Sequence, residues 1–186
     1  MVGNDIVDIN LAQQQSNWQR PRFLEKLFSQ RERDRIYNSK TPFLMVWRLW
    51  SMKEAAYKLY TQLYPSRFYN PKGFECFIKG DSGEVLFKDF KCYVETKTSS
   101  NYIISEARLQ PKIFNSEIVE FGSEAIQTNS IELRQSLLNA VSNKYDISEE
   151  LTLKKNEYGT PSVYFNSKHI RISMTHHGKY GAFAIA

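Results

Sequence analysis

The fold is decided by Trp47-Arg48-Leu49-Trp50-Ser51-Met52-Lys53-Glu54-Ala55-Ala56-Tyr57-Lys58, the middle of a predicted long helix. The helix is expected to begin after Thr41, with Pro42 in its first turn, and to end before Pro65. At about 100° per residue, one narrow apolar stripe indicates the side that faces a core. The stripe consists of Met45, Leu49, Met52, Ala56, Leu59 and Leu63.

The opposite side of this helix is unusual for a solvent-exposed surface. It carries Trp47, Trp50, Glu54, Lys58 and Thr61, so two indole rings lie beside a carboxylate and an ammonium group. Glu54 and Lys58 stand four residues apart, and the simplest interpretation is a surface ion pair worth a few tenths of a kcal/mol. The tryptophans favour a second interpretation, in which a ligand or another part of the protein covers this side.

The composition limits the classes of function. The chain has 186 residues, 41% of them hydrophobic, which suffices for one globular domain with a core. The net charge of +5 fits an acidic partner, but no basic run is dense enough to indicate nucleic acid. No apolar run approaches the roughly 18 residues that a membrane-spanning helix needs. Cys76 and Cys92 lack metal-site spacing, and neither a signal peptide nor an internal repeat is evident, so a reduced, cytoplasmic protein is expected.

The N-terminal stretch from Val2 to Ile9 predicts a short buried strand that contains Asp5 and Asp8. In an ideal strand these two carboxylates point to opposite faces, so at most one of them faces a given site unless the chain turns. A carboxylate among Ile and Val side chains is costly unless it is paired or bound to a cation. The alternative is that both carboxylates lie in water at the end of the strand.

The C-terminal stretch predicts a hairpin. Residues 170–176 alternate as a strand that places His176 on one face, and residues 180–186 return as a strand of small residues. The turn His177-Gly178-Lys179 brings two histidines and a lysine together, which suits an anion, although ordinary loop polarity also explains them.

The remaining elements are predicted from periodicity and turn residues. Ser29 and Glu32 form a capping box that opens a short helix ending near Tyr37. Strands are expected at 74–79, 85–90, 91–97, 102–109, 117–121, 151–155 and 162–165, and a helix at 130–144.

These pieces together indicate one kind of chemistry. Carboxylates of Asp5, Asp8 and Glu54 suit Mg²⁺, an ion that retains waters and is completed by substrate phosphates. The cationic or proton-carrying side chains that suit the phosphates themselves are Lys58, His176 and Lys179. The residues alone therefore predict a Mg²⁺-dependent enzyme that acts on a phosphate ester or anhydride.

Four motifs, in this order, resemble those of the 4′-phosphopantetheinyl transferase superfamily, and the order is that of its holo-acyl-carrier-protein synthases. Gly3-Asn4-Asp5-Ile6-Val7-Asp8-Ile9 is similar to G-x-D-I-V-E-I, and residues 50–58 are similar to W-x-x-K-E-A-x-x-K. Tyr158-Gly159-Thr160-Pro161 is similar to the G-K-P turn, and residues 172–180 to the S-x-S-H-x-G-x-Y/W hairpin. The resemblance covers residues 1–75 and 150–186, whereas residues 85–150 carry no assignable motif.

The resemblance implies transfer of the 4′-phosphopantetheine arm of coenzyme A to a serine of a carrier protein, with release of 3′,5′-ADP. It implies that Asp5, Asp8 and Glu54 hold Mg²⁺, with Mn²⁺ as an alternative and with Asp8 acting directly or through water. Glu54 is also expected to be the general base, and Lys58 to be catalytic and to contact the phosphates. The further residues expected to bind coenzyme A are Arg48, Lys53, His176 and Lys179.

The resemblance also implies an α+β fold, in which an antiparallel sheet packs against the long central helix. Residues 1–186 are expected to form a single domain with an insertion at about 85–150. The expected partners are coenzyme A and an apo acyl or peptidyl carrier protein, and not nucleic acid or a membrane. The acidic carrier is expected at the basic segment Arg20 to Lys26.

Sites of this family lie between two similar units, so a homo-oligomer, preferably a trimer, is expected. The unassigned middle of the chain is the alternative source of a second unit, and the protein would then be a monomer. Two residues depart from the family pattern, because Asp8 replaces a glutamate and Thr160 replaces the lysine of the G-K-P turn.

Two other functions remain open at this point. One is a metal-dependent phosphohydrolase that uses water as the nucleophile, and the other is a non-catalytic relative that binds coenzyme A or a carrier. The sequence does not choose among carriers of fatty-acid, polyketide and peptide synthesis.

Overall fold

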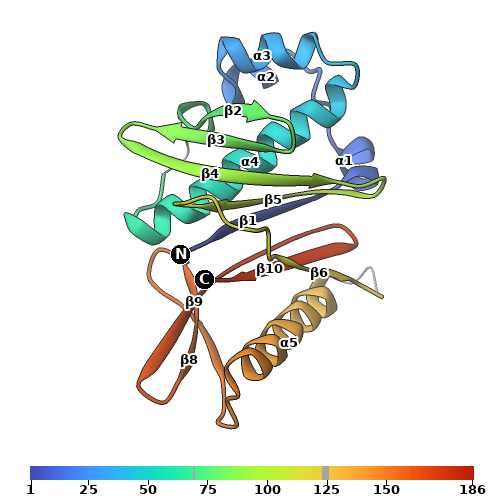
Figure 1. Cartoon of the computed structure of the whole chain (residues 1–186). Coiled ribbons are helices and arrows are strands. Elements are labelled where there is room, and N and C mark those ends of the chain that lie inside the picture. The colour runs from blue at the N-terminus through green and yellow to red at the C-terminus, as the bar shows by residue number, and fades with distance from the viewer. Residues whose placement is uncertain (69, 123–125) are drawn as a thin grey trace.

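The computed structural model describes residues 1–68, 70–122 and 126–186. Two five-stranded antiparallel sheets lie one above the other, and each has a long helix on one face (Figure 1). The helices are α1 (Ile9–Gln15), α2 (Phe23–Leu27), α3 (Gln30–Tyr37), α4 (Pro42–Leu63), the 3₁₀ turn η1 (Pro71–Gly73) and α5 (Ile126–Tyr145). The strands are β1 (Gly3–Asp8), β2 (Glu75–Lys79), β3 (Ser82–Phe87), β4 (Phe90–Thr98), β5 (Tyr102–Arg108), β6 (Glu117–Glu120), β7 (Thr152–Lys155), β8 (Pro161–Phe165), β9 (Lys168–His177) and β10 (Tyr180–Ile185). The fold is α+β, as predicted.

The helix α4 has nearly the predicted bounds and the predicted core stripe. Thr41 is its N-cap residue, but the Thr41 side chain makes no capping hydrogen bond. Four of the stripe residues, Leu49, Met52, Ala56 and Leu59, are fully buried against the first sheet. Burial is not confined to this stripe, since Trp47, Lys53 and Thr61 are buried as well, so other parts of the protein cover α4 on more than one side.

One turn in the first sheet was missed by the sequence prediction. The expected strand at 85–90 is divided, since β3 ends at Phe87 and β4 begins at Phe90. Lys88, with a φ of 53°, makes the tight connection. Lysine is not a residue that signals a left-handed turn, so the apolar flanks concealed the hairpin.

The two sheets have the same topology. The first sheet has the order β1-β5-β4-β3-β2 and the second has the order β6-β10-β9-β8-β7. In each sheet, the strand that comes first in the chain pairs with the strand that comes last, so β1 pairs with β5 and β6 pairs with β10. In each unit, a long helix lies between the first strand and the second strand in chain order. We call residues 3–108 the first unit and residues 117–185 the second unit. The segment 85–150, apart from 123–125, which lie outside the described residues, therefore contains the end of one unit and the start of the other.

A short stretch of sequence also repeats, although no repeat was evident from the sequence alone. Asp5-Ile6-Val7-Asp8 in β1 corresponds to Glu117-Ile118-Val119-Glu120 in β6. Asp8 pairs with Tyr102 in the first sheet, and Glu120 pairs with Tyr180 in the second. The repetition is therefore one of topology, and the two units share few identical residues, so the sequence alone did not indicate it.

Equivalent residues of the two units meet at the contact between the sheets. The rings of Tyr102 and Tyr180 lie 5.1 Å apart, centroid to centroid. Around them lies a small core of Ile6, Ile104, Phe114, Ile118 and Ala182. The two units are therefore joined by a hydrophobic contact that equivalent strands supply from both sides.

Candidate functional site

A cleft of about 520 Å³ lies between the two units and contains three of the predicted site residues, Asp5, Lys58 and His176. The first unit contributes Asp5 and Lys58, from β1 and α4. The second unit contributes His176 on β9 and the turn at 158–161. The structure thus brings together residues from both ends of the chain, and residues from all four motifs line one cavity.

Lys58 and Asp5 form the polar centre of this cleft. The Lys58 Nζ lies 3.0 Å from Asp5 Oδ1 and donates to the carbonyl oxygen of Asn4 at 2.9 Å. Both side chains are partly exposed, at 29% for Lys58 and 11% for Asp5, so an incoming anion can reach the ammonium group. Glu54, the i,i+4 neighbour of Lys58 on α4, does not form an ion pair with it among the described contacts.

Glu54 lies in an adjoining cavity of about 240 Å³, lined by Trp50 and Tyr57 among others. Burial, and after it the negative charge of Asp5, raise the pKa of Glu54 to about 7, while Lys58 acts in the opposite direction. A carboxylate with a pKa near neutral pH can accept a proton and release it again. Glu54 is therefore suited to act as a general base.

Asp8 links the two units through hydrogen bonds. Its Oδ1 accepts the N–H of Leu11 and caps α1, and its Oδ2 accepts the N–H of Lys179, both at 3.0 Å. The Asp8 N–H donates to Nδ1 of His177 at 2.9 Å. Gly178 is required here, because an added Cβ would lie 2.3 Å from Asp8 Oδ2. Both oxygens of Asp8 thus have backbone donors, which assigns Asp8 a structural role in joining α1 and the C-terminal hairpin.

The carboxylates fit a magnesium ion that has few protein ligands. Asp5 and Glu54 are near enough for one charge to affect the other's pKa, and Mg²⁺ commonly binds through one or two carboxylates together with substrate phosphates. Within residues 1–68, 70–122 and 126–186, no group of three or more His, Cys, Asp or Glu side chains is preassembled. Asp5 and Glu54 are therefore the residues that would hold the ion.

Lys53, expected to bind coenzyme A, borders the cavity of Glu54, but its ammonium group is held by buried partners. It is 1% exposed, and its ammonium lies 2.8 Å from the carboxylate of Glu32. The same group donates to the carbonyl oxygens of Pro71 and Phe74. Glu32, the capping-box residue of α3, also accepts the N–H of Cys76. Lys53 therefore joins α4 to α3 and to the chain before β2, and it has no place in the cleft between the units.

Arg48 and Lys179 are likewise not brought to the centre of the cleft. The guanidinium of Arg48 donates to the carbonyl oxygen of Gly80, in the turn between β2 and β3. The backbone of Lys179 holds Asp8, while its side chain is exposed. The structure thus places Arg48 on the far side of α4 and Lys179 at the rim formed by the C-terminal hairpin.

The two tryptophans line a separate groove and not the cleft with Lys58. This groove, of about 330 Å³, also contains Phe23 and Leu27 of α2 and His177 of the hairpin. Arg20 and Lys26 lie along it. Trp50 also lines the cavity of Glu54, whereas Trp47 is only 9% exposed and lies in the groove beside α2, so the protein itself covers part of this side of α4.

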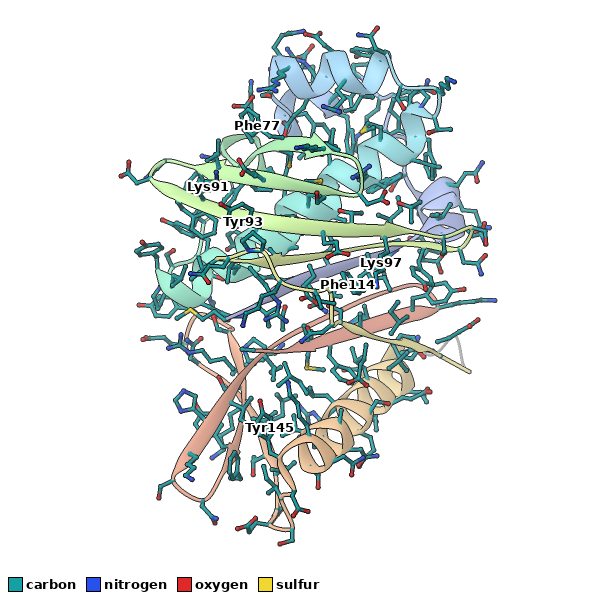
Figure 2. All side chains as sticks on the ribbon, viewed as in Figure 1. Phe77, Lys91, Tyr93, Lys97, Phe114 and Tyr145 are labelled. Atoms are coloured by element: carbon teal, nitrogen blue, oxygen red, sulfur yellow. The ribbon has the colours of Figure 1, made fainter. Side chains whose placement is uncertain are left out.

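A further cavity, of about 490 Å³, contains none of the predicted site residues. It lies on the face of the first sheet away from α4, where the side chains of Phe77, Tyr93 and Phe114 project (Figure 2). Its charged side chains include Lys79 and Arg108 together with Glu84 and Glu106. The balance of charge does not indicate one class of ligand.

Sequence reasoning missed three polar residues of the cleft. Arg134 on α5 and Lys155 on β7 line it together with Lys58, so its charge is more positive than the motifs indicated. The Thr175 hydroxyl donates to Asp5 Oδ1 at 3.0 Å. Arg134 and Lys155 lie in or next to the stretch without motifs, and only their charge distinguished them. Thr175 was quoted within a motif but was given no role.

One comparison with known proteins gave a match. A family model described as ACPS, 4'-phosphopantetheinyl transferase superfamily, matches residues 1–109, which is more than half of the chain. The match ends where β5 ends, at the boundary of the first unit. No curated protein matches the chain.

Proposed function

Because the chain belongs to the 4′-phosphopantetheinyl transferase superfamily, we propose that it moves the 4′-phosphopantetheine arm of coenzyme A onto a serine of a carrier protein. The single observation that carries the proposal is the cleft between the units. There the acidic residue and the lysine of the family motifs face His176, which lies in the second unit and outside the matched range. The other product is 3′,5′-ADP.

The basic lining of the cleft supports coenzyme A as the substrate. Coenzyme A carries a pyrophosphate and a 3′-phosphate, and the cleft offers Lys58, Arg134, Lys155 and His176. Cations from both units can therefore neutralise phosphates at more than one point, which is the main requirement of phosphoryl transfer. The described part of the chain includes no helix long and apolar enough to cross a membrane.

The chemistry forms one bond and breaks one bond at phosphorus. The serine oxygen of the carrier bonds to the phosphorus that bears the pantetheine arm, and the bond from this phosphorus to the 3′,5′-ADP oxygen breaks. Glu54 takes the serine proton as the general base. Lys58 neutralises negative charge on the phosphates. Mg²⁺, held by Asp5 and Glu54, would supply further positive charge for the leaving phosphate.

The carrier is proposed to dock on α2 and the segment before it. Arg20 and Lys26 lie along the groove that contains Phe23, Trp47 and Trp50, so basic and aromatic side chains occur together. Carrier proteins are acidic, and opposite charge would steer them to this groove. His177 also lines this groove, and its neighbour His176 lines the cleft, so the C-terminal hairpin borders both.

Charge reversal tests this docking site. Arg20→Glu combined with Arg22→Glu should raise the KM for the carrier several-fold and leave the Kd of coenzyme A unchanged, because neither residue lines the cleft. A matched control reverses two exposed lysines of the second unit, Lys154 and Lys168. Equal KM values in the two double variants would exclude this docking surface.

One chain is proposed to contain a complete site, and the whole chain to be one domain. The two units that border the cleft belong to the same molecule, so no second subunit is needed to bring His176 to Lys58. This supports the monomer over the expected trimer as the active species.

Intact-mass measurement tests the function. Apo carrier protein incubated with this protein, coenzyme A and Mg²⁺ should gain the mass of one 4′-phosphopantetheine arm, and Glu54→Ala should abolish the gain. Release of phosphate or of 3′,5′-ADP without a modified carrier would indicate the phosphohydrolase instead. Binding of coenzyme A without any reaction, across several carriers, would indicate the non-catalytic relative.

A further inference from the structure

The outer edge of β1 is completed by side chains and not by another strand. On its inner side β1 pairs with β5. On its outer side the N–H groups of Asn4 and Asp8 donate to Ser173 Oγ and His177 Nδ1, each at 2.9 Å. Between them, the N–H of Ile6 donates to Thr175 Oγ1 at 3.4 Å. Three alternate amides of the first unit are therefore bonded to three alternate side chains of the second unit.

This ladder of side chains sets the register between the units. Residues 173, 175 and 177 lie on one face of β9, and each meets the next alternate residue of β1. A shift of β9 by one residue would turn these three side chains away from β1 and leave buried amides without acceptors. The spacing Ser-x-Thr-x-His is thus a device for placing the second unit against β1.

Thr175 has a second contact that its neighbours in the ladder lack. Its hydroxyl donates to Asp5 Oδ1 at 3.0 Å, the same oxygen that lies 3.0 Å from the Lys58 ammonium. Thr175 and Asp5 are both buried as whole residues, so little water competes for this bond. Two donors on one oxygen, one from each unit, restrict the rotation of the carboxylate about its side chain.

We propose that Thr175 is a positioning residue that orients the Asp5 carboxylate for a divalent cation, so that a full-affinity cation site exists only when the two units are in register. This rests on the proposed function, in which Asp5 and Glu54 hold Mg²⁺. The supporting bond crosses 170 positions of sequence, from the last hairpin to the first strand. The second unit therefore takes part in the cation site without contributing a ligand.

The test measures Mn²⁺ binding to the whole chain by electron paramagnetic resonance, in the absence of coenzyme A and carrier. Thr175→Val removes the hydroxyl and keeps the shape, and it should weaken Mn²⁺ binding by about tenfold, the lower range for loss of a residue that supports a ligand. Thr175→Ser keeps the donor and should bind Mn²⁺ as the wild type does. Thr175→Ala is the second variant without a hydroxyl, in case the valine is not accommodated.

Ser173→Ala is the matched control. It removes the neighbouring rung of the ladder and leaves the Thr175 hydroxyl on Asp5, so it should lower the unfolding temperature and leave Mn²⁺ affinity unchanged. Mn²⁺ affinity in Thr175→Val equal to that of the wild type, or reduced only as far as in Ser173→Ala, would overturn the positioning role. A wild-type chain that binds no Mn²⁺ would overturn it as well.

The outcomes separate this inference from the proposed function. Mn²⁺ binding that depends on Thr175, in a protein that modifies no carrier, would leave the positioning role in place and defeat the transferase proposal. If the wild type and Thr175→Val both modify the carrier and bind Mn²⁺ with equal affinity, the transferase proposal stands and the positioning role of Thr175 is defeated.

Discussion

At the scale of single residues, Glu54 combines its proposed function as a base with a cost in stability. The neutral form of its carboxyl group is favoured by burial and by the Asp5 charge, which together raise its pKa from 4.5 to about 7. At pH above 7 the folded protein must hold this charge in a cavity that disfavours it. In the unfolded chain the same group ionises freely, so the raised pKa destabilises the folded state at neutral and alkaline pH.

Glu54→Gln should therefore stabilise the protein in the absence of divalent metal. The folded state retains a proton that the unfolded state has lost between pH 4.5 and about 7, so the wild type loses stability as pH rises through this window. At pH 8 the variant should be more stable by up to about 3 kcal/mol, and near pH 4.5 the difference should disappear. Urea unfolding in EDTA measures this, and parallel stability curves would contradict it.

At the scale of elements, α4 is attached to its surroundings by a buried ion pair. Lys53 and Glu32 are each 1% exposed, and their partners extend to η1 and to the start of β2. The family motif contains this lysine beside the glutamate of the site. Its place in the core offers a structural reason for a lysine there, because it fixes the helix that presents Glu54 and Lys58.

Lys53→Met should unfold at much lower urea concentration than the wild type. Removal of one partner leaves the Glu32 carboxylate buried and unpaired, at a cost of about 3–5 kcal/mol. The double variant Lys53→Met with Glu32→Gln should recover a large part of the loss, and its Kd for coenzyme A should equal that of the wild type. A large increase of that Kd in the folded double variant would instead support a phosphate contact by Lys53.

The C-terminal hairpin offers a second test at this scale. Gly178 has a φ of 58°, and a Cβ there would meet Asp8 Oδ2, whereas Gly159 has a φ of 86° with open space around its Cβ position. Both substitutions by alanine pay for the left-handed backbone, at about 1 kcal/mol each. Gly178→Ala should lower the unfolding temperature clearly more than Gly159→Ala, because the added Cβ also disrupts the hydrogen bond from the Lys179 N–H to Asp8 Oδ2. Equal costs would mean that the Asp8 contact adds no stability.

At the scale of the whole molecule, the site is a product of two units with one topology. The first unit supplies Asp5 and Lys58, with Glu54 in the adjoining cavity, and the second supplies His176, Arg134 and Lys155. The repeated strands β1 and β6 have different roles, since β1 meets β9 along the ladder while β6 begins with the exposed Glu117. The two halves of the molecule have thus become specialised for different parts of one cleft.

Mixing two inactive variants tests whether each chain is sufficient. Glu54→Ala disables the first unit's part of the cleft, and His176→Ala disables the second unit's part. If the site forms within one chain, an equimolar mixture should show only the summed residual activities of the two variants. If the site forms between chains, as in the expected trimer, the mixture should regain activity because some interfaces combine intact halves.

The sequence by itself determined the local elements and the nature of the chemistry. Periodicity and caps located α4, the capping box of α3 and the C-terminal hairpin, because these depend on neighbours within a few residues. Motifs identified Asp5, Glu54, Lys58 and His176 as a set, since their residue types suit a cation and phosphates. The family was recognisable for the same reason.

Only the tertiary structure decided how these residues are used. The ladder from Ser173, Thr175 and His177 to β1, the commitment of Asp8 to backbone donors and the burial of Lys53 all depend on long-range contacts. The partners in the ladder lie 169 residues apart, so no local pattern marks them. The shared topology of the two units was concealed for a related reason, because different side chains can satisfy the same burial and strand pairing.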